Sequence, residues 1–570
     1  MEDIFKKVIL SIISLILIVV FLNSCGGDEK GSITGTSNSE TETTGSESEP
    51  PSVSSIEPAD NTENVAVDTS VSVTFSKTMK PSSITVNSTD TNCSGVLQIS
   101  HDNFSSCLLL SDVVSITNDN KTFTINPAMN IGFNMRSNVL VTMGALDTEE
   151  MAMTAEFSSV FYTRSGVLDS SFGINGIVTY VNPDPSADSE TGKAVVTDAN
   201  GKIIVAGYIS INGSNDIAVW RYNPDGSLDT GFGTNGVYLY DGGFGHDEGY
   251  AVAVDTSNRI LVAGTTSNGA NFDMILLRIT PSGTPDFSFD GDGDVTADIA
   301  GFSDNGYGIG FDSNEDIMVA GQAYDGTDWD LVIWKFNING GVVVAFGASG
   351  KVITDIGGNS NDNAYGMTVD SNGKMIVVGQ TNAGSANYNM LLVRYNVDGT
   401  LDTSFNTTGI VTLDNIAGGT GDDTAYSVTV DPTNDILVTG QSASATVYDM
   451  FLLKYKSDGT LDNSFGTGGI VTHNGAAGGS DWDYGNSIAL DSANKVVVVG
   501  TSKNIDLKFN NVIWRYNPDG TLDTGFNSVG IAVHGSSSDD YFGSGLSIDA
   551  NRRMLVTGTK GTSMEILRYY

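Results

Sequence analysis

Six carboxylates recur at one position of a repeated sequence pattern, and these residues have the clearest potential for chemistry. Each of them stands eight residues before another Asp; they are Glu190, Asp247, Asp304, Asp362, Asp423 and Asp483. In a seventh copy, Tyr541 beside Asp540 takes this place. Such a ring of carboxylates predicts a site for a cation or a basic group. Calcium is the natural candidate because it takes about six to eight oxygen ligands in flexible geometry. The alternative is that each side chain accepts backbone N–H bonds within its own loop.

Few other residues suggest catalysis. The chain has four His, no G-x-S-x-G sequence and no phosphate-binding glycine loop with a lysine in register. We therefore predict no catalytic residue, and no cofactor other than calcium is suggested. An enzyme of the calcium-dependent or carbohydrate-active type is the first alternative.

The six carboxylates belong to a unit that occurs seven times between residue 166 and residue 570. One copy reads RYNPDGSLDTGFGTNGVYLYD and then YAVAVDTSNRILVAG. The step is 57 to 61 residues, as marked by the phenylalanines Phe172, Phe232, Phe289, Phe346, Phe405, Phe465 and Phe526. A unit of this kind cannot bury its own apolar face, so it must stack on its neighbours.

Each unit predicts four short antiparallel strands and no helix, which is the pattern of a β-propeller blade. The first unit contributes an outer strand at residues 176–180 without a preceding strand of its own, and the last unit lacks a following one. One strand of each unit carries a small residue at the same place: Ala194, Ala251, Gly308, Gly366, Ser427, Ser487 and Gly545. If this strand is innermost, the six carboxylates should circle one mouth of the central channel. We therefore predict a seven-bladed β-propeller over residues 164–570, closed when the N-terminal outer strand completes the last blade.

The other repeated residues are expected to be structural. The phenylalanines should be buried wedges, and the Asp that closes each innermost strand, such as Asp370, should accept N–H bonds of its turn. Each third strand carries one cation, such as Arg221, which should pair with an acid such as Asp229.

The segment RYNPDGSLDTGFGTNG, residues 221–236, and its copies resemble the delta-60 repeat, an uncharacterised β-propeller repeat. The resemblance extends over residues 164–570 and implies the same propeller fold. It is weakest in the fourth copy, where Val342-Val343 replaces the Leu-Asp pair.

The N-terminus has the features of an export signal. Lys6 and Lys7 precede an apolar run at residues 8–22, which has the length of a signal-peptide core and is short for a membrane span. The run ends in Leu22-Asn23-Ser24-Cys25, which resembles a bacterial lipobox. That resemblance implies a signal peptide of residues 1–24, a lipid on Cys25 and the outer membrane of a Gram-negative envelope. An ordinary signal peptide or an uncleaved anchor is the alternative, and the face of the membrane is left open.

Residues 25–51 are rich in Gly, Ser, Thr and Glu, so they predict a disordered tether. Residues 52–163 alternate apolar and polar residues and predict a β-sandwich. Its segment PADNTENVAVDTSVSVTFSKTM resembles the bacterial Ig-like domain, which implies a spacer or an adhesive module and no catalytic residue. In an oxidising envelope, Cys93 and Cys107 are expected to form a disulfide, with two free thiols as the alternative.

The fold class is therefore all-β, an Ig-like β-sandwich followed by a seven-bladed β-propeller. The net charge of −41 opposes binding to nucleic acid and to anionic lipid headgroups. We expect a lipid-anchored envelope protein that contacts the membrane through its lipid only and presents the propeller as a non-catalytic binding scaffold. Its partner, a protein or a glycan, is not identified by the sequence, and a structural surface component is the second alternative.

Overall fold

The structure is a computed structural model that describes residues 49–570, except residues 130, 132–135, 164, 445 and 446. The predicted signal peptide and Cys25 lie outside the described residues. In the described part, every regular element is a β-strand apart from the 3-10 helix η1 (Pro81–Ser83). None of the described elements is a helix long and apolar enough to cross a membrane.

The Ig-like part consists of two four-stranded sheets. The first has the order β1 (Val53–Glu57), β3 (Val71–Phe75), β6 (Thr122–Ile125), β5 (Ser115–Thr117). The second has the order β2 (Thr62–Val65), β8 (Phe157–Thr163), β7 (Arg136–Val141), β4 (Leu97–Ser100). Strand β3 shows the expected alternation, because Val71, Val73 and Phe75 are buried whereas Ser72 and Thr74 are partly exposed. These residues join Phe123, Val139 and Phe161 in one apolar core.

Cys93 and Cys107 form a disulfide, with their Cα atoms 5.0 Å apart. The prediction of a bridge between these two cysteines is therefore confirmed. The bridge closes a short loop of the Ig-like part, in which Cys107 is buried.

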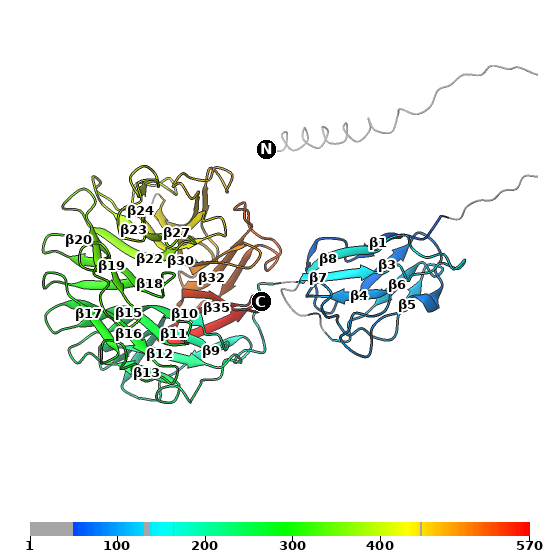
Figure 1. The fold of residues 1–570 in the computed structure, drawn as a ribbon, viewed down its shortest axis with the longest axis horizontal. Helices are drawn as coiled ribbons and strands as arrows, with labels where there is room; N and C mark the ends of the chain where they lie inside the picture. The colour runs from blue at the N-terminus through cyan, green and yellow to red at the C-terminus, as the bar shows by residue number, and fades with distance from the viewer. Residues whose placement is uncertain (1–48, 130, 132–135, 164, 445–446) are drawn as a thin grey trace, which may run out of the picture. The chain divides into compact units, whose positions relative to one another are not determined.

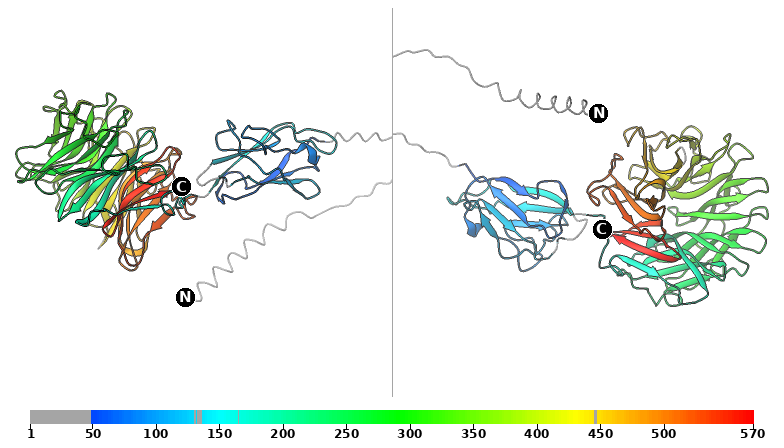
Figure 2. Two further views of the ribbon diagram at one scale, coloured as in Figure 1. Left: turned by 90° about the horizontal axis from the view of Figure 1, so that it is seen from below. Right: turned by 180° about the vertical axis from the view of Figure 1, so that it is seen from behind.

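The repeats form seven four-stranded antiparallel sheets, numbered 1 to 7 in chain order (Figures 1 and 2). Sheet 1 consists of β10 (Ala187–Thr197), β11 (Ile203–Ile211), β12 (Ser214–Tyr222) and β13 (Val237–Tyr240). Sheet 2 consists of β14 (Glu248–Val254), β15 (Ile260–Ser267), β16 (Phe272–Ile279) and β17 (Asp294–Ala297). Sheet 3 consists of β18 (Asp304–Phe311), β19 (Ile317–Tyr324), β20 (Trp329–Phe336) and β21 (Lys351–Thr354). Sheet 4 consists of β22 (Asp362–Val369), β23 (Met375–Thr381), β24 (Asn389–Tyr395) and β25 (Ile410–Leu413). Sheet 5 consists of β26 (Asp423–Val430), β27 (Ile436–Ala443), β28 (Tyr448–Tyr455) and β29 (Ile470–His473). Sheet 6 consists of β30 (Gly478–Leu490), β31 (Val496–Asn504), β32 (Phe509–Tyr516) and β33 (Ile531–His534). Sheet 7 consists of β34 (Tyr541–Ile548), β35 (Met554–Lys560), β36 (Ser563–Tyr569) and β9 (Ile177–Tyr180).

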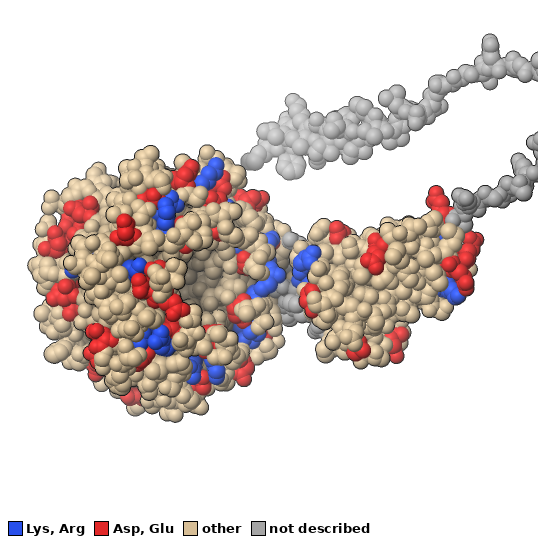
Figure 3. Space-filling model, in the orientation of Figure 1, with Lys and Arg blue, Asp and Glu red and all other residues tan. Residues whose placement is uncertain are grey.

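The first strand of each sheet contacts the first strand of the next sheet, and β34 of sheet 7 contacts β10 of sheet 1. These contacts are close because small residues lie where neighbouring first strands meet. A Cβ on Gly308 would lie 2.9 Å from Cγ of Met367 in the next sheet, and one on Gly545 would lie 2.9 Å from Cα of Ala194. Strand β9, from the start of the repeats, pairs with β36, from their end; for example, Thr179 pairs with Glu565. The sheets fan around a common centre, where the space-filling view is hollowed (Figure 3).

The repeated phenylalanines and cations form a structural unit at the outer edge of each sheet. All seven phenylalanines are at most 2% exposed. In sheet 4, Arg394 donates to Asp402 at 2.7 Å, stacks its guanidinium 4.4 Å from the centroid of Phe405 and donates to the backbone oxygen of Ser457 in the next unit. Arg221 pairs with Asp229 in the same way. The prediction of buried wedges and structural ion pairs is therefore confirmed at these positions.

Where the third-strand cation is a lysine, it pairs with the Asp that follows the innermost strand: Lys335 with Asp312 at 2.7 Å and Lys454 with Asp431 at 3.0 Å. The Asp that follows each innermost strand also serves its turn, since Asp370 Oδ1 accepts the backbone N–H groups of Asn372 and Lys374. These acids are thus structural acceptors.

Candidate functional site

Every innermost strand has a β-bulge at the same place. Its pairing with the second strand shifts by one residue in each of the seven sheets, which leaves one residue unpaired: Lys193, Tyr250, Tyr307, Tyr365, Tyr426, Asn486 and Ser544 in sheets 1 to 7. A bulge bends the strand and re-aims the side chain of the extra residue. The repeat therefore places one re-aimed side chain per sheet on the innermost strands.

Four consecutive bulge residues are tyrosines, which we call the tyrosine arc: Tyr250, Tyr307, Tyr365 and Tyr426. Their ring centroids are 4.8, 5.6 and 5.8 Å apart in sequence order, so the rings form a continuous surface across sheets 2 to 5. All four are partly exposed. Burial raises the pKa of Tyr307 and of Tyr426 to about 12, so these hydroxyl groups stay neutral. The arc offers aromatic faces together with uncharged hydroxyl groups.

One end of the arc carries opposite charges. Glu248 in β14 accepts hydrogen bonds from the hydroxyl of Tyr250 at 2.7 Å and from the amide of Asn215 at 2.5 Å. Lys193, the bulge residue of sheet 1, has its Nζ 5.7 Å from the ring centroid of Tyr208. Burial lowers the pKa of Lys193, and the charge of Glu248 opposes this. The bulge residues and Glu248 thus supply a single carboxylate and a single amine.

A second aromatic group, formed by Tyr448, Trp482, Tyr484, Phe509 and Phe542, covers sheets 5 to 7. Tyr448 and Trp482 are 6.2 Å apart, and Phe509 and Phe542 are 5.0 Å apart between centroids. Lys503 Nζ lies 4.1 Å from the centroid of Trp482. Phe542 is 38% exposed, so part of this group faces solvent.

The six carboxylates of the repeat are not exposed at a rim. Glu190 is 6% exposed and the five aspartates are at most 1% exposed. Each accepts a backbone N–H from the loop before it, at 2.5–3.0 Å; the donors are, in chain order, Asn182, Gly242, Ile299, Ile356, Asn415 and Gly475. They accept hydrogen bonds as the alternative interpretation expects, and their side chains are buried. Burial raises the pKa of Asp304 to about 7 and those of Asp362, Asp423 and Asp483 to about 6.

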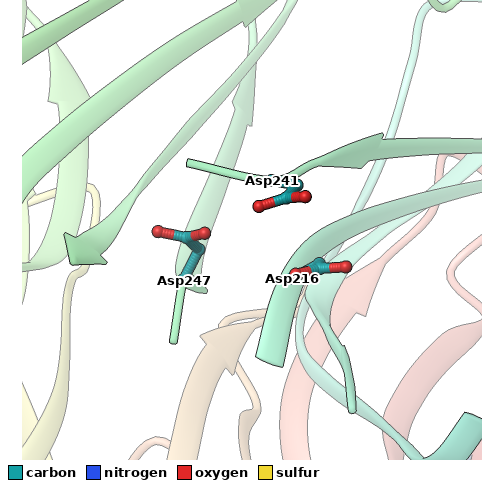
Figure 4. A group of neighbouring side chains, drawn as sticks. All are labelled: Asp216, Asp241 and Asp247. Atoms are coloured by element: carbon teal, nitrogen blue, oxygen red, sulfur yellow. The ribbon is translucent and has the colours of Figure 1, made fainter. Parts of the chain in front are cut away.

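Three of the six carboxylates meet further aspartates at the boundaries between sheets. We call these groups the boundary clusters: Asp216, Asp241 and Asp247 between sheets 1 and 2; Asp273, Asp298 and Asp304 between sheets 2 and 3; and Asp330, Asp355 and Asp362 between sheets 3 and 4. In each cluster, carboxylate oxygens lie within 4.8 Å of one another. Figure 4 shows the first cluster, in which the three side chains come from three separate segments.

Sequence reasoning identified only one member of each boundary cluster. The other two come from the start of a third strand and from the residue after an outer strand, as with Asp216 and Asp241. The sequence does contain a signal that could have identified the third-strand member, which is an acid five residues before the third-strand cation. Asp216, for example, stands five residues before Arg221. Only the folded chain shows that these positions meet.

A pocket of about 980 Å³ lies at the outer edge, between β9 and β13. Tyr180, Tyr222 and Tyr238 contribute to its lining, and the lining residues include no acidic or basic side chain. The lining of this pocket therefore offers no carboxylate, imidazole or amine for acid–base chemistry.

Comparisons with known proteins agree with this architecture. A bacterial Ig-like domain family matches residues 47–163, and a family described as a domain of unknown function (DUF5122) beta-propeller matches residues 199–232, 256–289, 371–405, 432–465 and 494–526. No curated protein matches the chain significantly.

Several solved structures match part of the chain at low similarity. The polysaccharide lyase Uly1 is 11% identical, with 68% of this chain and 91% of that chain covered and a TM-score of 0.40. A gluconolactonase from Xanthomonas campestris is 10% identical (69% and 100% covered, TM-score 0.31), and a carbohydrate-active enzyme of family AA12 from Trichoderma reesei is 12% identical (71% and 97% covered, TM-score 0.33). Similarity at this level carries no information on activity. The chain thus contains a bacterial Ig-like domain followed by DUF5122 β-propeller repeats.

Proposed function

We propose that the protein is a lipid-anchored component of the cell envelope whose propeller is a non-catalytic binding scaffold. In this proposal the seven sheets are the blades of a closed seven-bladed propeller of residues 164–570, because β9 pairs with β36 and β34 contacts β10. The signal peptide of residues 1–24 is removed, Cys25 carries the lipid and residues 25–51 are the tether. The Ig-like domain of residues 52–163 is the spacer.

The tyrosine arc supports the scaffold function. Its four rings belong to consecutive sheets, contact one another and are kept partly exposed by a bulge in each strand. Aromatic faces with neutral hydroxyl groups suit a ligand that has flat apolar faces and its own hydroxyl groups. A glycan has this chemistry, and it is the ligand that we propose.

The enzyme alternative has less support. Hydrolysis or elimination at a sugar requires an acid and a base that reach one substrate bond. Glu248 hydrogen-bonds to the arc and already accepts two hydrogen bonds, and Asp422, whose charge helps to raise the pKa of Tyr426, accepts the backbone N–H of Tyr388. The buried aspartates accept N–H bonds of their own loops and lie between sheets.

A glycan array probed with the purified full chain tests the proposal, followed by calorimetric titration of the best glycan. Tyr307→Ala should weaken binding at least about tenfold, because it interrupts the arc at a ring with two aromatic neighbours. Tyr238→Ala, a partly exposed tyrosine of the outer strand β13, is the matched control and should bind as the parent does. Equal loss in both variants, or no glycan bound by the parent, contradicts the proposal; product formation from a bound glycan would favour the enzyme.

A further inference from the structure

The boundary cluster between sheets 3 and 4 contains more carboxylates than the other two. Asp330 in β20 belongs to two groups of three: one with Asp355 and Asp362, the other with Asp325 and Asp328. The oxygens within each group lie within 4.8 Å of one another. Four further carboxyl groups, those of Asp325, Asp328, Asp355 and Asp362, therefore surround the side chain of Asp330.

Buried oxygens in these clusters have no partner. Asp330 is 7% exposed, and its Oδ1 atom is buried and accepts no hydrogen bond. Asp304, 0% exposed, also has a buried Oδ1 without a partner in the cluster between sheets 2 and 3. None of the ion pairs among the described residues includes a member of either cluster. An unpaired buried carboxylate is costly, and a cation is the partner that would remove this cost.

The equivalent places between later sheets show that the fold does not require three carboxylates there. Between sheets 5 and 6, Asn474 replaces one acid, and its amide donates to Asp449 Oδ1 at 2.7 Å. Between sheets 4 and 5 one position is Asn389, and between sheets 6 and 7 the positions are Asn510, Gly535 and Tyr541. Where an acid is absent, an amide or a neutral residue takes its place. The clusters with three acids are confined to three consecutive boundaries, which points to a ligand there.

We propose that the boundary cluster around Asp330 binds a divalent cation, calcium by preference, and that the Asp304 cluster binds a second calcium ion. Calcium binds oxygens at about 2.3–2.6 Å, so two oxygens on opposite sides of one ion are about 4.6–5.2 Å apart. In each cluster the oxygens lie within 4.8 Å of one another, so they are close enough to share one calcium ion. Magnesium requires about 2.0–2.1 Å and a stricter octahedral geometry.

Protons compete with the cation at these sites. Burial raises the pKa of Asp330 to about 6, and the charges of Asp355 and Asp328 add to this. A bound ion would favour the charged carboxylates. This site is distinct from the tyrosine arc, and the inference does not depend on glycan binding.

Calorimetric titration of the purified, chelator-treated full chain with calcium chloride at pH 7.5 tests the proposal, together with the melting temperature. We expect binding heat and a melting temperature about 3 °C or more higher at about 5 mM calcium. Asp330→Asn should remove at least one bound calcium ion per chain and melt at a higher temperature than the parent without calcium, because like-charge repulsion is reduced. Asp355→Asn should lower calcium affinity about tenfold. Because Asp355 is exposed, directly after β21, this substitution should disturb folding less than a substitution of the buried Asp330.

Asp449→Asn is the matched control, because it occupies the same strand position in a cluster that already contains Asn474. It should retain the calcium stoichiometry of the parent. The proposal is overturned if the parent shows no calcium response, or if Asp330→Asn and Asp355→Asn bind calcium as the parent does. An equal or larger response to magnesium would overturn the assignment to calcium.

Discussion

The substitution Phe405→Ala tests whether the repeated phenylalanines hold neighbouring sheets together. Phe405 is 0% exposed and packs in a core that contains Leu392 of sheet 4 together with Val438 and Leu453 of sheet 5. A buried phenylalanine removes about 200 Å² from water, worth about 5 kcal/mol at 25 cal/mol per Å². Truncation to Ala retains part of this burial, and substitutions of this type cost about 3 to 5 kcal/mol. Stacking of Arg394 on the ring, at 4.4 Å, adds about 0.5 to 2 kcal/mol.

Thermal unfolding followed by circular dichroism, together with urea titration, measures the effect. Phe405→Ala should lower both the melting temperature and the urea midpoint. Phe244→Ala is the control, because Phe244 is 69% exposed and its truncation should change the stability by less than about 0.5 kcal/mol. If Phe405→Ala melts like the parent, or no lower than Phe244→Ala, the phenylalanine is not a wedge between sheets and this reasoning is refuted.

Three further outcomes are expected. Burial and the charges of Asp298 and Asp273 raise the pKa of Asp304 to about 7 from its ordinary 3.8, so the folded state binds this proton more tightly than the unfolded state does. The calcium-free protein should therefore lose stability as the pH rises from about 4 to about 7, and melting curves of Asp304→Asn should show a weaker dependence; an equal dependence would contradict this. Deletion of residues 168–181 removes β9 and Asp169, the partner of Arg568 at 2.6 Å, so limited proteolysis should start in sheet 7, and a parent-like digestion pattern would contradict the closing role of β9. Cys25→Ala should release the protein from the membrane fraction, whereas unchanged membrane retention would argue against a lipid at this residue.

The repeat made most of the fold predictable. A period near 58 residues, with four apolar runs per unit, predicted four-stranded sheets, and the structure has this pattern in all seven. The wedge phenylalanines and the pairing of Arg221 with Asp229 were also predictable, because a residue that recurs in every unit has the same local environment in every unit.

The candidate site was less predictable. The six recurring carboxylates were expected at the mouth of the central channel. Their burial was not predicted, because sequence register does not show which way a side chain points at the start of a strand. In the structure, the preceding loop folds back over each carboxylate and donates an N–H to it, as the loop residue Ile299 does for Asp304. The tyrosines at positions 250, 307, 365 and 426 escaped notice as a site because a bulge breaks the strict alternation on which sequence reasoning depends.

The sequence by itself determined the all-β class, the Ig-like domain, the repeat and its structural residues, because these depend on local patterns and on a fixed period. Only the tertiary structure decided which residues of different units meet. Asp330, Asp355 and Asp362 come from a third strand, the end of an outer strand and the start of the next unit's first strand, and their separations in the chain are unrelated to their separation in space. The boundary clusters and the tyrosine arc both exist between sheets, so they are properties of the stacking and not of any single unit.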